Sequence, residues 1–490
     1  MFKPTLSEAK VYENYTLLPI STEIISDVHT PIEVMKILKG ISKHCFILES
    51  AEDTKTWGRY TFLGFDPKMK ITCQDGIVMI TDIEGKETTM IDNPIKHIQE
   101  VLNTHKAPKI EGLPPFCGGL VGYFAYDYAK YYEPSLNLKA TDRCYFRDTD
   151  LMLFDKVIAF DQYRQKIIFI VNIRTNSPKG LEIEYERGKV ELEYLKKLIQ
   201  SGTSHKIPAS KLKSEFKPLF SKEEYCDMVQ KAKGYIKEGD IFQVVLSNRF
   251  EADFEGSLFN TYRVLRSINP SPYMFYFSGT DFEFAGASPE TLVKLKDGKL
   301  FTFPLAGTRP RGKTEEEDIA LENELLSDEK ELAEHNMLVD LGRNDLGKIS
   351  KFGSVQVSKY MNVLRFSHVM HIGSVVTSDI ENKTGLDAIG AVLPAGTLSG
   401  APKIRAMKII DELEKNKRGI YGGAVGYLDF TGNMDTCIAI RLAYKKDGKV
   451  FVRSGAGIVA DSNPELEYQE CLNKARAVKK ALVESMEVGE

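Results

Sequence analysis

The chain lacks the features that mark secreted, zinc-binding and membrane-spanning proteins. Its seven cysteines are an odd number, lie scattered between Cys45 and Cys471, and include no C-x-x-C pair. Neither a disulfide framework nor a zinc site is therefore expected. No apolar run approaches the roughly 20 residues that span a bilayer, and the first residues lack the apolar segment of a signal peptide. We expect a protein of the reducing cytoplasm.

An excess of charge of one sign is also lacking. The 65 Lys and Arg residues and the 69 Asp and Glu residues give a formal net charge of −4. The two signs are interleaved, which argues against nucleic acid or a membrane surface as a partner. What the chain does have is length. Its 490 residues, 42% of them hydrophobic, are more than a single hydrophobic core usually contains. The length therefore predicts two large lobes.

The N-terminal part is rich in strand patterns. Strands are predicted at 45–50, 60–65, 69–73, 77–81, 118–126 and within 151–173. The Asp75-Gly76 turn between two of them predicts a hairpin. A charged helix is expected over 179–199.

A polar, turn-rich stretch from Ser201 to Pro208 separates this part from the rest. We predict an N-terminal regulatory lobe at 1–205, a linker at 206–215 and a C-terminal catalytic lobe at 216–490. Within the last, Ser221 followed by Glu224 is the pattern of a capped helix start.

Two Glu-x-x-Glu pairs lie in predicted helices. Glu331 and Glu334 fall within a helix expected from about 315 to 341, and Glu467 and Glu470 precede a second helical stretch. The spacing places both carboxylates of a pair on one helix face. Facing pairs would suit Mg²⁺, which takes oxygen ligands. A single pair of this kind is more often a solvated helix surface.

Two glycine-containing segments are candidates for anion binding. Residues 394–403 open a helix predicted to end near Glu414, and free N–H groups at a helix start attract anions. The spacing does not match a nucleotide phosphate loop, and without further context a tight turn into a helix is the favoured interpretation. Gly455 and Gly457 follow a strand predicted at 449–452, where backbone N–H groups can approach a carboxylate. A turn or bulge is the alternative.

Three further polar side chains have two interpretations each. Arg441, in the strand-like run 437–441, is predicted to be a buried cation that needs an anion, either structural or substrate. His368 and His371 are three residues apart, a spacing that suggests a zinc site, although a lone His is more often structural. Zinc binding is not supported, because neither an H-E-x-x-H pattern nor nearby cysteines accompany them.

Together and in this order, these segments resemble the chorismate-utilising enzymes, a family that includes anthranilate, aminodeoxychorismate, isochorismate and salicylate synthases. The resemblance covers essentially all of 216–485. The matching segments are 239–247, 286–290, 304–312, 331–345, 367–371, 396–403, 421–427 and 455–470. The resemblance implies an α/β (α+β), two-lobed fold of the anthranilate synthase component I type. In that fold, large, mainly antiparallel sheets pack in a sandwich flanked by helices.

The resemblance also implies a site. Glu334 and Glu470 would bind Mg²⁺, with Glu331 and Glu467 in support. Chorismate would be bound by Gly307, Thr308, Tyr421, Arg441, Gly455, Ala456 and Gly457. Because chorismate is a dianion, a carboxylate-lined site binds it through a bridging cation, with Arg and N–H groups on its other carboxylate.

Two positions distinguish members of the family. Isochorismate and salicylate synthases place a Lys base where this chain has Gln243, which cannot act as a base. Aminodeoxychorismate synthases place a nucleophilic Lys where this chain has Ala306. The remaining pattern is direct attack by ammonia, as in anthranilate synthases. The resemblance then implies Glu290 as the general acid, Thr397 as its partner and His371 as the residue that handles the C2 proton.

Regulation and partners are implied in the same way. Leu48-Glu49-Ser50 and 269–274 are similar to the two halves of a tryptophan feedback site, formed here by Ser50, Pro272, Tyr273 and Met274. No Gly-x-Cys-x-Gly turn of a glutaminase is present, so a separate glutamine amidotransferase subunit is expected, in a heterotetramer of two large and two small subunits. An aminodeoxychorismate synthase and a tryptophan-binding relative without activity remain the alternatives.

Overall fold

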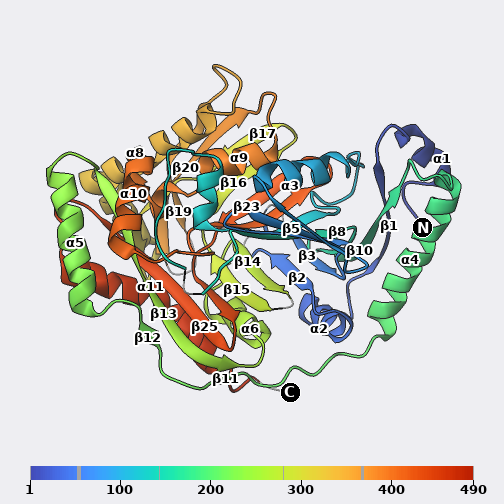
Figure 1. Ribbon diagram of the computed structural model, residues 1–490, viewed down its shortest axis with the longest axis horizontal. Helices are drawn as coiled ribbons and strands as arrows, with labels where there is room; N and C mark the ends of the chain where they lie inside the picture. Colours follow the sequence, from blue (N-terminus) through green and yellow to red (C-terminus); the bar gives the residue numbers. More distant parts are fainter. Residues whose placement is uncertain (1, 52–56, 143, 280, 366–368, 489–490) are drawn as a thin grey trace.

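The computed structural model describes residues 2–51, 57–142, 144–279, 281–365 and 369–488 (Figure 1). In this part of the chain, sheets of 13 and 12 strands are formed, and their strands pair antiparallel. The mixed α/β class with large antiparallel sheets, predicted above, is confirmed.

The first sheet combines strands from both ends of the sequence. Its order is β1 (Leu17–Ile25), β10 (Lys166–Arg174), β9 (Lys156–Asp161), β3 (Tyr60–Phe65), β2 (Cys45–Glu49), β14 (Tyr273–Ser278), β15 (Phe282–Ser288), β24 (Leu442–Lys446), β25 (Lys449–Ile458), β13 (Gln243–Glu255) and β11 (Lys211–Leu212). Two short strands, β12 (Lys217–Pro218) and β21 (Gly400–Ala401), also pair with β13.

The second sheet is built in the same way. Its order is β18 (Leu305–Pro310), β20 (Val369–Asp379), β17 (Lys299–Thr302), β16 (Thr291–Lys296), β23 (Met434–Ile438), β22 (Ala424–Asp429), β7 (Gly119–Phe124), β8 (Thr149–Phe154), β4 (Met69–Gln74), β5 (Ile77–Asp82) and β6 (Glu87–Ile91). At one end β19 (Gln356–Arg365) pairs with β20.

Helices cover the outer face of each sheet. Against the first sheet lie α2 (Pro31–Ile41), α4 (Leu181–Ser201), α5 (Lys222–Lys237), α6 (Phe259–Ile268), α10 (Lys403–Glu414) and α11 (Pro464–Glu484). Against the second lie α3 (Pro94–Asn103), α7 (Glu315–Ser327), α8 (Glu329–Gly347) and α9 (Gly385–Val392). Shorter helices are α1 (Leu6–Ala9), η1 (Lys10–Tyr12), η2 (Trp57–Arg59), η3 (Tyr126–Tyr131) and η4 (Gly396–Leu398). Figure 1 shows α5 and α4 at opposite ends of the molecule. No helix in the described ranges is both long and apolar enough to cross a membrane.

The two sheets pack face to face over an aromatic core. In β14, Phe275 and Phe277 point into this core, whereas Met274 and Tyr276 point toward the helices of the first sheet. This alternation follows from the two-residue period of a strand, and burial on both faces explains why the strand is apolar throughout. Side chains such as Phe46, which is fully buried, each contribute about 2 kcal/mol of hydrophobic stabilisation.

Most predicted elements are confirmed, including the β4–β5 hairpin and the capped start of α5 at Ser221. Three predictions are wrong. The helix expected over 315–341 is two helices, because Asp328 leaves the helical conformation and accepts hydrogen bonds from the N–H groups of Lys330 and Glu331 at 3.1 and 3.2 Å. The strand expected at 449–452 continues to Ile458, because its pairing with β13 continues to that residue.

A third correction concerns Arg441. The predicted strand ends at Ile438, and Arg441 lies in the connection to β24 with φ +51°. The direction of its side chain is therefore set by the backbone of this turn and not by the two-residue alternation of a strand.

Strands from before and after 206–215 are neighbours in both sheets. β2 pairs with β14 in the first sheet, and β7 pairs with β22 in the second. Residues 206–215 themselves include β11, which pairs with the end of β13. The two predicted lobes thus share their sheets, and the assignment of a regulatory role to 1–205 and a catalytic role to 216–490 stays a prediction.

Candidate active site

A cavity of about 810 Å³ opens where the two sheets and their helices meet. It brings together most of the predicted site residues. Those lining it are Glu290, Gly307, Thr308, Glu334, His371, Thr397, Tyr421, Arg441, Gly455, Gly457, Glu467 and Glu470. Segments more than 150 positions apart in the sequence therefore contribute to one site.

The two predicted carboxylate faces meet in this cavity. Glu334 lies on α8, which packs on the second sheet, and Glu467 and Glu470 lie on α11, which packs on the first. Burial raises the pKa of Glu334, and the negative charges of Glu331 and Glu470 raise it further. Burial also raises the pKa of Glu467, with a further contribution from Glu470. Crowded, partly buried carboxylates of this kind favour a bound cation.

Glu331 lies beside the cavity instead of lining it. Its carboxylate is 3.5 Å from the Arg309 guanidinium, which also bonds Glu324 at 3.0 Å and Asp328 at 2.9 Å. A Cβ atom placed on Gly307, where φ is +67°, would come within 3.3 Å of Glu331 Oε2. Glu331 is therefore paired with Arg309 of β18 and lies close to Gly307 in the same strand.

Glu290 is held by the glycine-rich segment. The Thr397 hydroxyl donates a hydrogen bond to Glu290 Oε1 at 3.0 Å. Burial raises the pKa of Glu290 to about 7, although the Thr397 hydrogen bond and the charges of Lys474 and Arg441 oppose the shift. A carboxyl group that is partly protonated at neutral pH is suited to general acid catalysis.

His371 is oriented by the backbone of the neighbouring strand. Its Nδ1 lies 2.8 Å from the carbonyl oxygen of Gly307 and 3.0 Å from the Thr308 hydroxyl. Because a carbonyl oxygen only accepts, Nδ1 carries the hydrogen, and Nε2 is the basic nitrogen of the neutral ring. Burial lowers the pKa of His371, and Arg441 lowers it further.

Glycines let the backbone of β25 form one wall. A Cβ on Gly455 would lie 2.4 Å from the Leu246 carbonyl oxygen, and one on Gly457 would lie 2.6 Å from Gln243 Nε2. Neither position accepts a side chain without displacing a neighbour. Ala456 is fully buried and does not line the cavity.

Comparison with known proteins identifies the family. The family model described as chorismate binding enzyme matches residues 43–480. The chain belongs to the chorismate-binding enzyme family.

The relatives of this chorismate-binding enzyme match it over its whole length. Anthranilate synthase component 1 of Acetivibrio thermocellus is 45% identical over 510 aligned positions, covering 100% of each chain. The protein of the same name from Aquifex aeolicus (strain VF5) is 47% identical, covering 96% of each.

Solved structures agree with the fold. The crystal structure of anthranilate synthase component I from Streptococcus pneumoniae TIGR4 superposes with a TM-score of 0.75 at 39% identity, covering 93% of this chain and 98% of that one. The menaquinone-specific isochorismate synthase MenF of Escherichia coli, at 20% identity and a TM-score of 0.71, covers 97% of this chain and 98% of its own and shares the fold.

Sequence reasoning missed two lysines, Lys330 and Lys474, that line the site of this chorismate-binding enzyme. Lys474 lines the cavity, and its Nζ lies 2.6 Å from Glu470 Oε1 and 3.2 Å from the Gly455 carbonyl oxygen. Its position four residues after Glu470 on one helix was the available signal, since such residues are neighbours on the helix surface. His368 lies outside the described residues.

A second cavity of about 640 Å³ contains the residues predicted to bind tryptophan. Ser50, Pro272, Tyr273 and Met274 all line it. The pairing of β2 with β14 places Glu49 opposite Met274, which brings the two halves of the predicted motif together. Pro272 lines both cavities, so the segment before β14 separates the two sites.

Proposed function

We propose that this chain is the large subunit of an anthranilate synthase, which converts chorismate and ammonia to anthranilate and pyruvate. The relatives named anthranilate synthase component 1, matched over the whole chain, carry this proposal. The chemistry of the cavity supports it. Gln243 and Ala306 line the cavity at the two positions where other reactions of the family use lysine, and neither side chain is a base or a nucleophile.

Mg²⁺ fits the facing helices α8 and α11. No group of three or more His, Cys, Asp or Glu side chains in the described ranges is arranged to hold a metal. Two carboxylates suffice for Mg²⁺, however, since this ion usually keeps several waters and binds substrate anions. Glu334 and Glu470 would hold the ion, with Glu467 in support. Bound there, Mg²⁺ would neutralise one chorismate carboxylate, while Arg441 and the N–H groups of β25 would bind the other.

The proposed first step is addition of ammonia at C2 of chorismate with loss of the C4 hydroxyl group. Protonated Glu290 donates its proton to that hydroxyl, which leaves as water. The Thr397 hydroxyl orients the Glu290 carboxyl through the hydrogen bond of 3.0 Å. Burial of Glu290 is therefore useful, because it keeps the acid protonated near neutral pH.

In the second step His371 removes the proton from C2, the C3–O bond breaks as the ring becomes aromatic, and the departing enolpyruvate takes up a proton to become pyruvate. The neutral imidazole is suited to this, since Nδ1 is engaged with the Gly307 carbonyl oxygen and Nε2 can accept a proton.

We further propose that a cytoplasmic glutamine amidotransferase subunit supplies the ammonia, within a heterotetramer, and that tryptophan binds the second cavity as feedback inhibitor. The pairing of Glu49 with Met274, which brings the neighbouring Ser50 and Tyr273 to one cavity, supports the latter.

One experiment tests the activity. The purified chain is incubated with chorismate, Mg²⁺ and an ammonium salt, and anthranilate fluorescence is followed. We expect turnover that is lost with EDTA, inhibited by tryptophan, and absent when glutamine replaces ammonium. Release of an aminated product without pyruvate would instead identify an aminodeoxychorismate synthase. Absence of turnover under all conditions would favour a tryptophan-binding protein without activity.

A further inference from the structure

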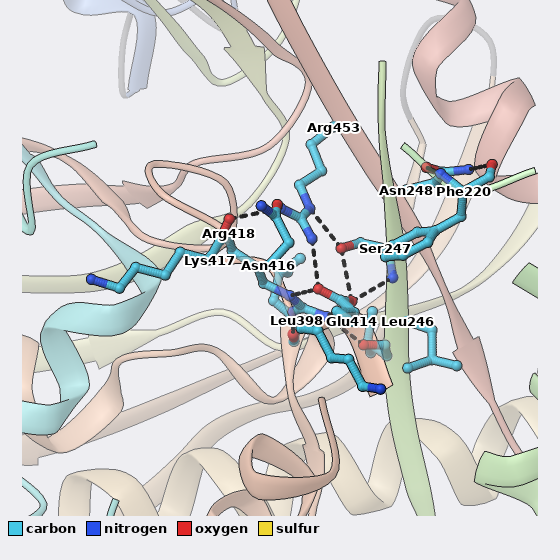
Figure 2. Close-up of polar contacts among 12 residues, drawn as sticks. Phe220, Leu246, Ser247, Asn248, Leu398, Glu414, Asn416, Lys417, Arg418 and Arg453 are labelled. Atoms are coloured by element: carbon cyan, nitrogen blue, oxygen red, sulfur yellow. Dashed lines mark hydrogen bonds and ion pairs between the residues drawn. The ribbon is translucent and has the colours of Figure 1, made fainter. Parts of the chain in front are cut away.

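A buried group of charged residues borders the first cavity, and one of them, Arg453, also lines it. The Glu414 cluster consists of Glu414, Arg418 and Arg453 with Ser247 and Asn416 around them (Figure 2). The three charged residues are only 2%, 3% and 6% exposed. The reaction steps above use none of them.

Glu414, at the end of α10, is the centre of the cluster. Its Oε1 accepts hydrogen bonds from the Ser247 N–H and hydroxyl at 2.8 and 2.9 Å and from Arg418 at 2.6 Å. Its Oε2 accepts from Arg418 at 3.0 Å and from Arg453 at 2.6 Å. Burial disfavours the charge, but Arg418 and Arg453 hold the pKa of Glu414 below its usual value. The carboxylate is therefore ionised.

The remaining donors of Arg418 bond backbone carbonyls of other segments, and those of Arg453 bond one backbone carbonyl and the side chains of Asn416 and Ser247. Arg418 donates to the Leu398 and Val245 carbonyl oxygens, both at 2.6 Å. Arg453 donates to the Asn416 side chain at 3.1 Å and to the Lys417 carbonyl oxygen at 3.0 Å. Only the planar guanidinium offers donors in this fixed geometry, so lysine cannot reproduce these contacts.

Those segments carry the reaction groups. Leu398 directly follows Thr397, the residue that bonds Glu290. Val245 and Ser247 of β13 pair with Gly457 and Gly455, the two glycines of the cavity wall.

Tyr421 is also within reach of the cluster. Its ring centre lies 5.9 Å from the Arg418 guanidinium, and its hydroxyl lies 3.1 Å from the position of a Cβ on Gly455. One carboxylate thus connects the Thr397 turn, Tyr421 and the glycine wall.

We propose that Glu414, acting through Arg418 and Arg453, is a positioning residue that holds the Thr397 turn against Glu290 and the glycine wall of β25 at the substrate. The proposal rests on the proposed function. A cluster with a purely structural role would affect stability alone.

The test compares Arg418→Lys with Thr397→Val and with the double variant. Arg418→Lys keeps the positive charge but loses the bonds to Leu398 and Val245. Since small misplacements of reacting groups cost up to about 100-fold, we expect Arg418→Lys to lower kcat at least about tenfold, with KM for chorismate changed less than about threefold. In the double variant the two effects should be far from additive, because both act through one hydrogen bond.

A pH profile gives a readout that stability does not move. Lys474 from α11, Arg441 from the β23–β24 connection and Thr397 act on Glu290. If Arg418→Lys releases Thr397, an interaction that lowers the Glu290 pKa is lost. The basic limb of the kcat profile should then move to higher pH, and Thr397→Val should move it in the same direction.

The matched control is Asp150→Asn. Asp150 is a fully buried carboxylate that bonds Arg147 at 2.6 Å and lines neither cavity. We expect this variant to lose thermal stability while kcat and the pH profile stay within about twofold of the parent. If Arg418→Lys does not fold, Arg453→Lys, which loses the contacts to Asn416 and Lys417, takes its place.

The outcomes separate the two proposals. If the parent chain forms no anthranilate, the proposed function fails. If the parent is active but Arg418→Lys behaves like Asp150→Asn, or if its effect and that of Thr397→Val simply add, the positioning role is overturned.

Discussion

At the residue scale, Glu290 illustrates a conflict between stability and chemistry. Its side chain is placed in a cavity wall where burial raises its pKa to about 7. An ionised carboxylate there is destabilising, since the unfolded chain solvates it fully. This position does not stabilise the fold, so a purely structural role does not explain why a carboxyl group is buried there. The same burial supplies a proton donor near neutral pH.

This conflict predicts that Glu290→Gln both inactivates and stabilises the protein. A pKa raised from the usual 4.5 to about 7 means that the stability associated with the protonated group is lost as pH rises between these values. The full effect corresponds to about 3 kcal/mol. We expect the variant to have a higher free energy of unfolding than the parent at pH 8, and an equal one near pH 4.

Urea denaturation at several pH values measures the difference, and anthranilate formation by the same samples should fall at least about 100-fold. A stability difference that does not change with pH would contradict the raised pKa. Full activity of the variant would contradict the acid role.

At the element scale, two helices on different sheets create the carboxylate site. α8 packs on β18 and β20 of the second sheet, and α11 packs on β25 of the first. Each begins at a polar cap, Asp328 for α8 and Asn463 for α11. The caps set where each helix begins and therefore which turn carries the glutamates into the cavity.

This arrangement predicts different roles for the four glutamates. Glu334→Gln and Glu470→Gln should each raise the Mg²⁺ concentration needed for half-maximal activity at least about tenfold, since a carboxylate ligand is lost. Glu331→Gln should change this concentration much less, because Glu331 is paired with Arg309. Mg²⁺ titration of activity, with calorimetric Mg²⁺ binding as a second readout, tests the order. An effect of Glu331→Gln equal to that of Glu334→Gln would contradict it.

At the scale of the whole molecule, two cavities share one segment. Asn269, Pro270 and Ser271 line the first cavity, Tyr273 and Met274 line the second, and Pro272 lines both. The Ala51 N–H donates to the Ser271 carbonyl oxygen at 3.1 Å, which links the segment to the end of β2. A ligand in the second cavity that shifts this segment would change the wall of the first.

Ser50→Phe should therefore weaken feedback, because the added ring occupies the second cavity. We expect the tryptophan concentration for half inhibition to rise at least about tenfold, since the bulky side chain excludes the ligand. Coupling between sites is reciprocal, so chorismate should weaken tryptophan binding to the parent by the same factor as tryptophan weakens chorismate binding. Calorimetric titration of each ligand, with and without the other, measures both. Unchanged inhibition in Ser50→Phe would place tryptophan elsewhere.

The sequence by itself determined the features that depend on neighbouring residues. Strand alternation, the Ser221 cap, the Asp75-Gly76 turn and the three-residue spacing of the glutamates all act over one or two turns of chain, and each was readable there. The order of the motifs indicated the family, because many short segments spread over residues 216–485 match it together.

Only the tertiary structure decided what distant segments do to one another. Pairing with β13 extends β25 through its glycines, Glu331 pairs with Arg309 beside the cavity, and Lys474 joins the site from α11. Glu414 lies near the charged residues Lys415, Lys417 and Arg418, which read locally as a solvated surface. Burial of Glu414 against Arg418, four residues further on, and against Arg453 of β25 is a property of packing, and the local pattern does not reveal it.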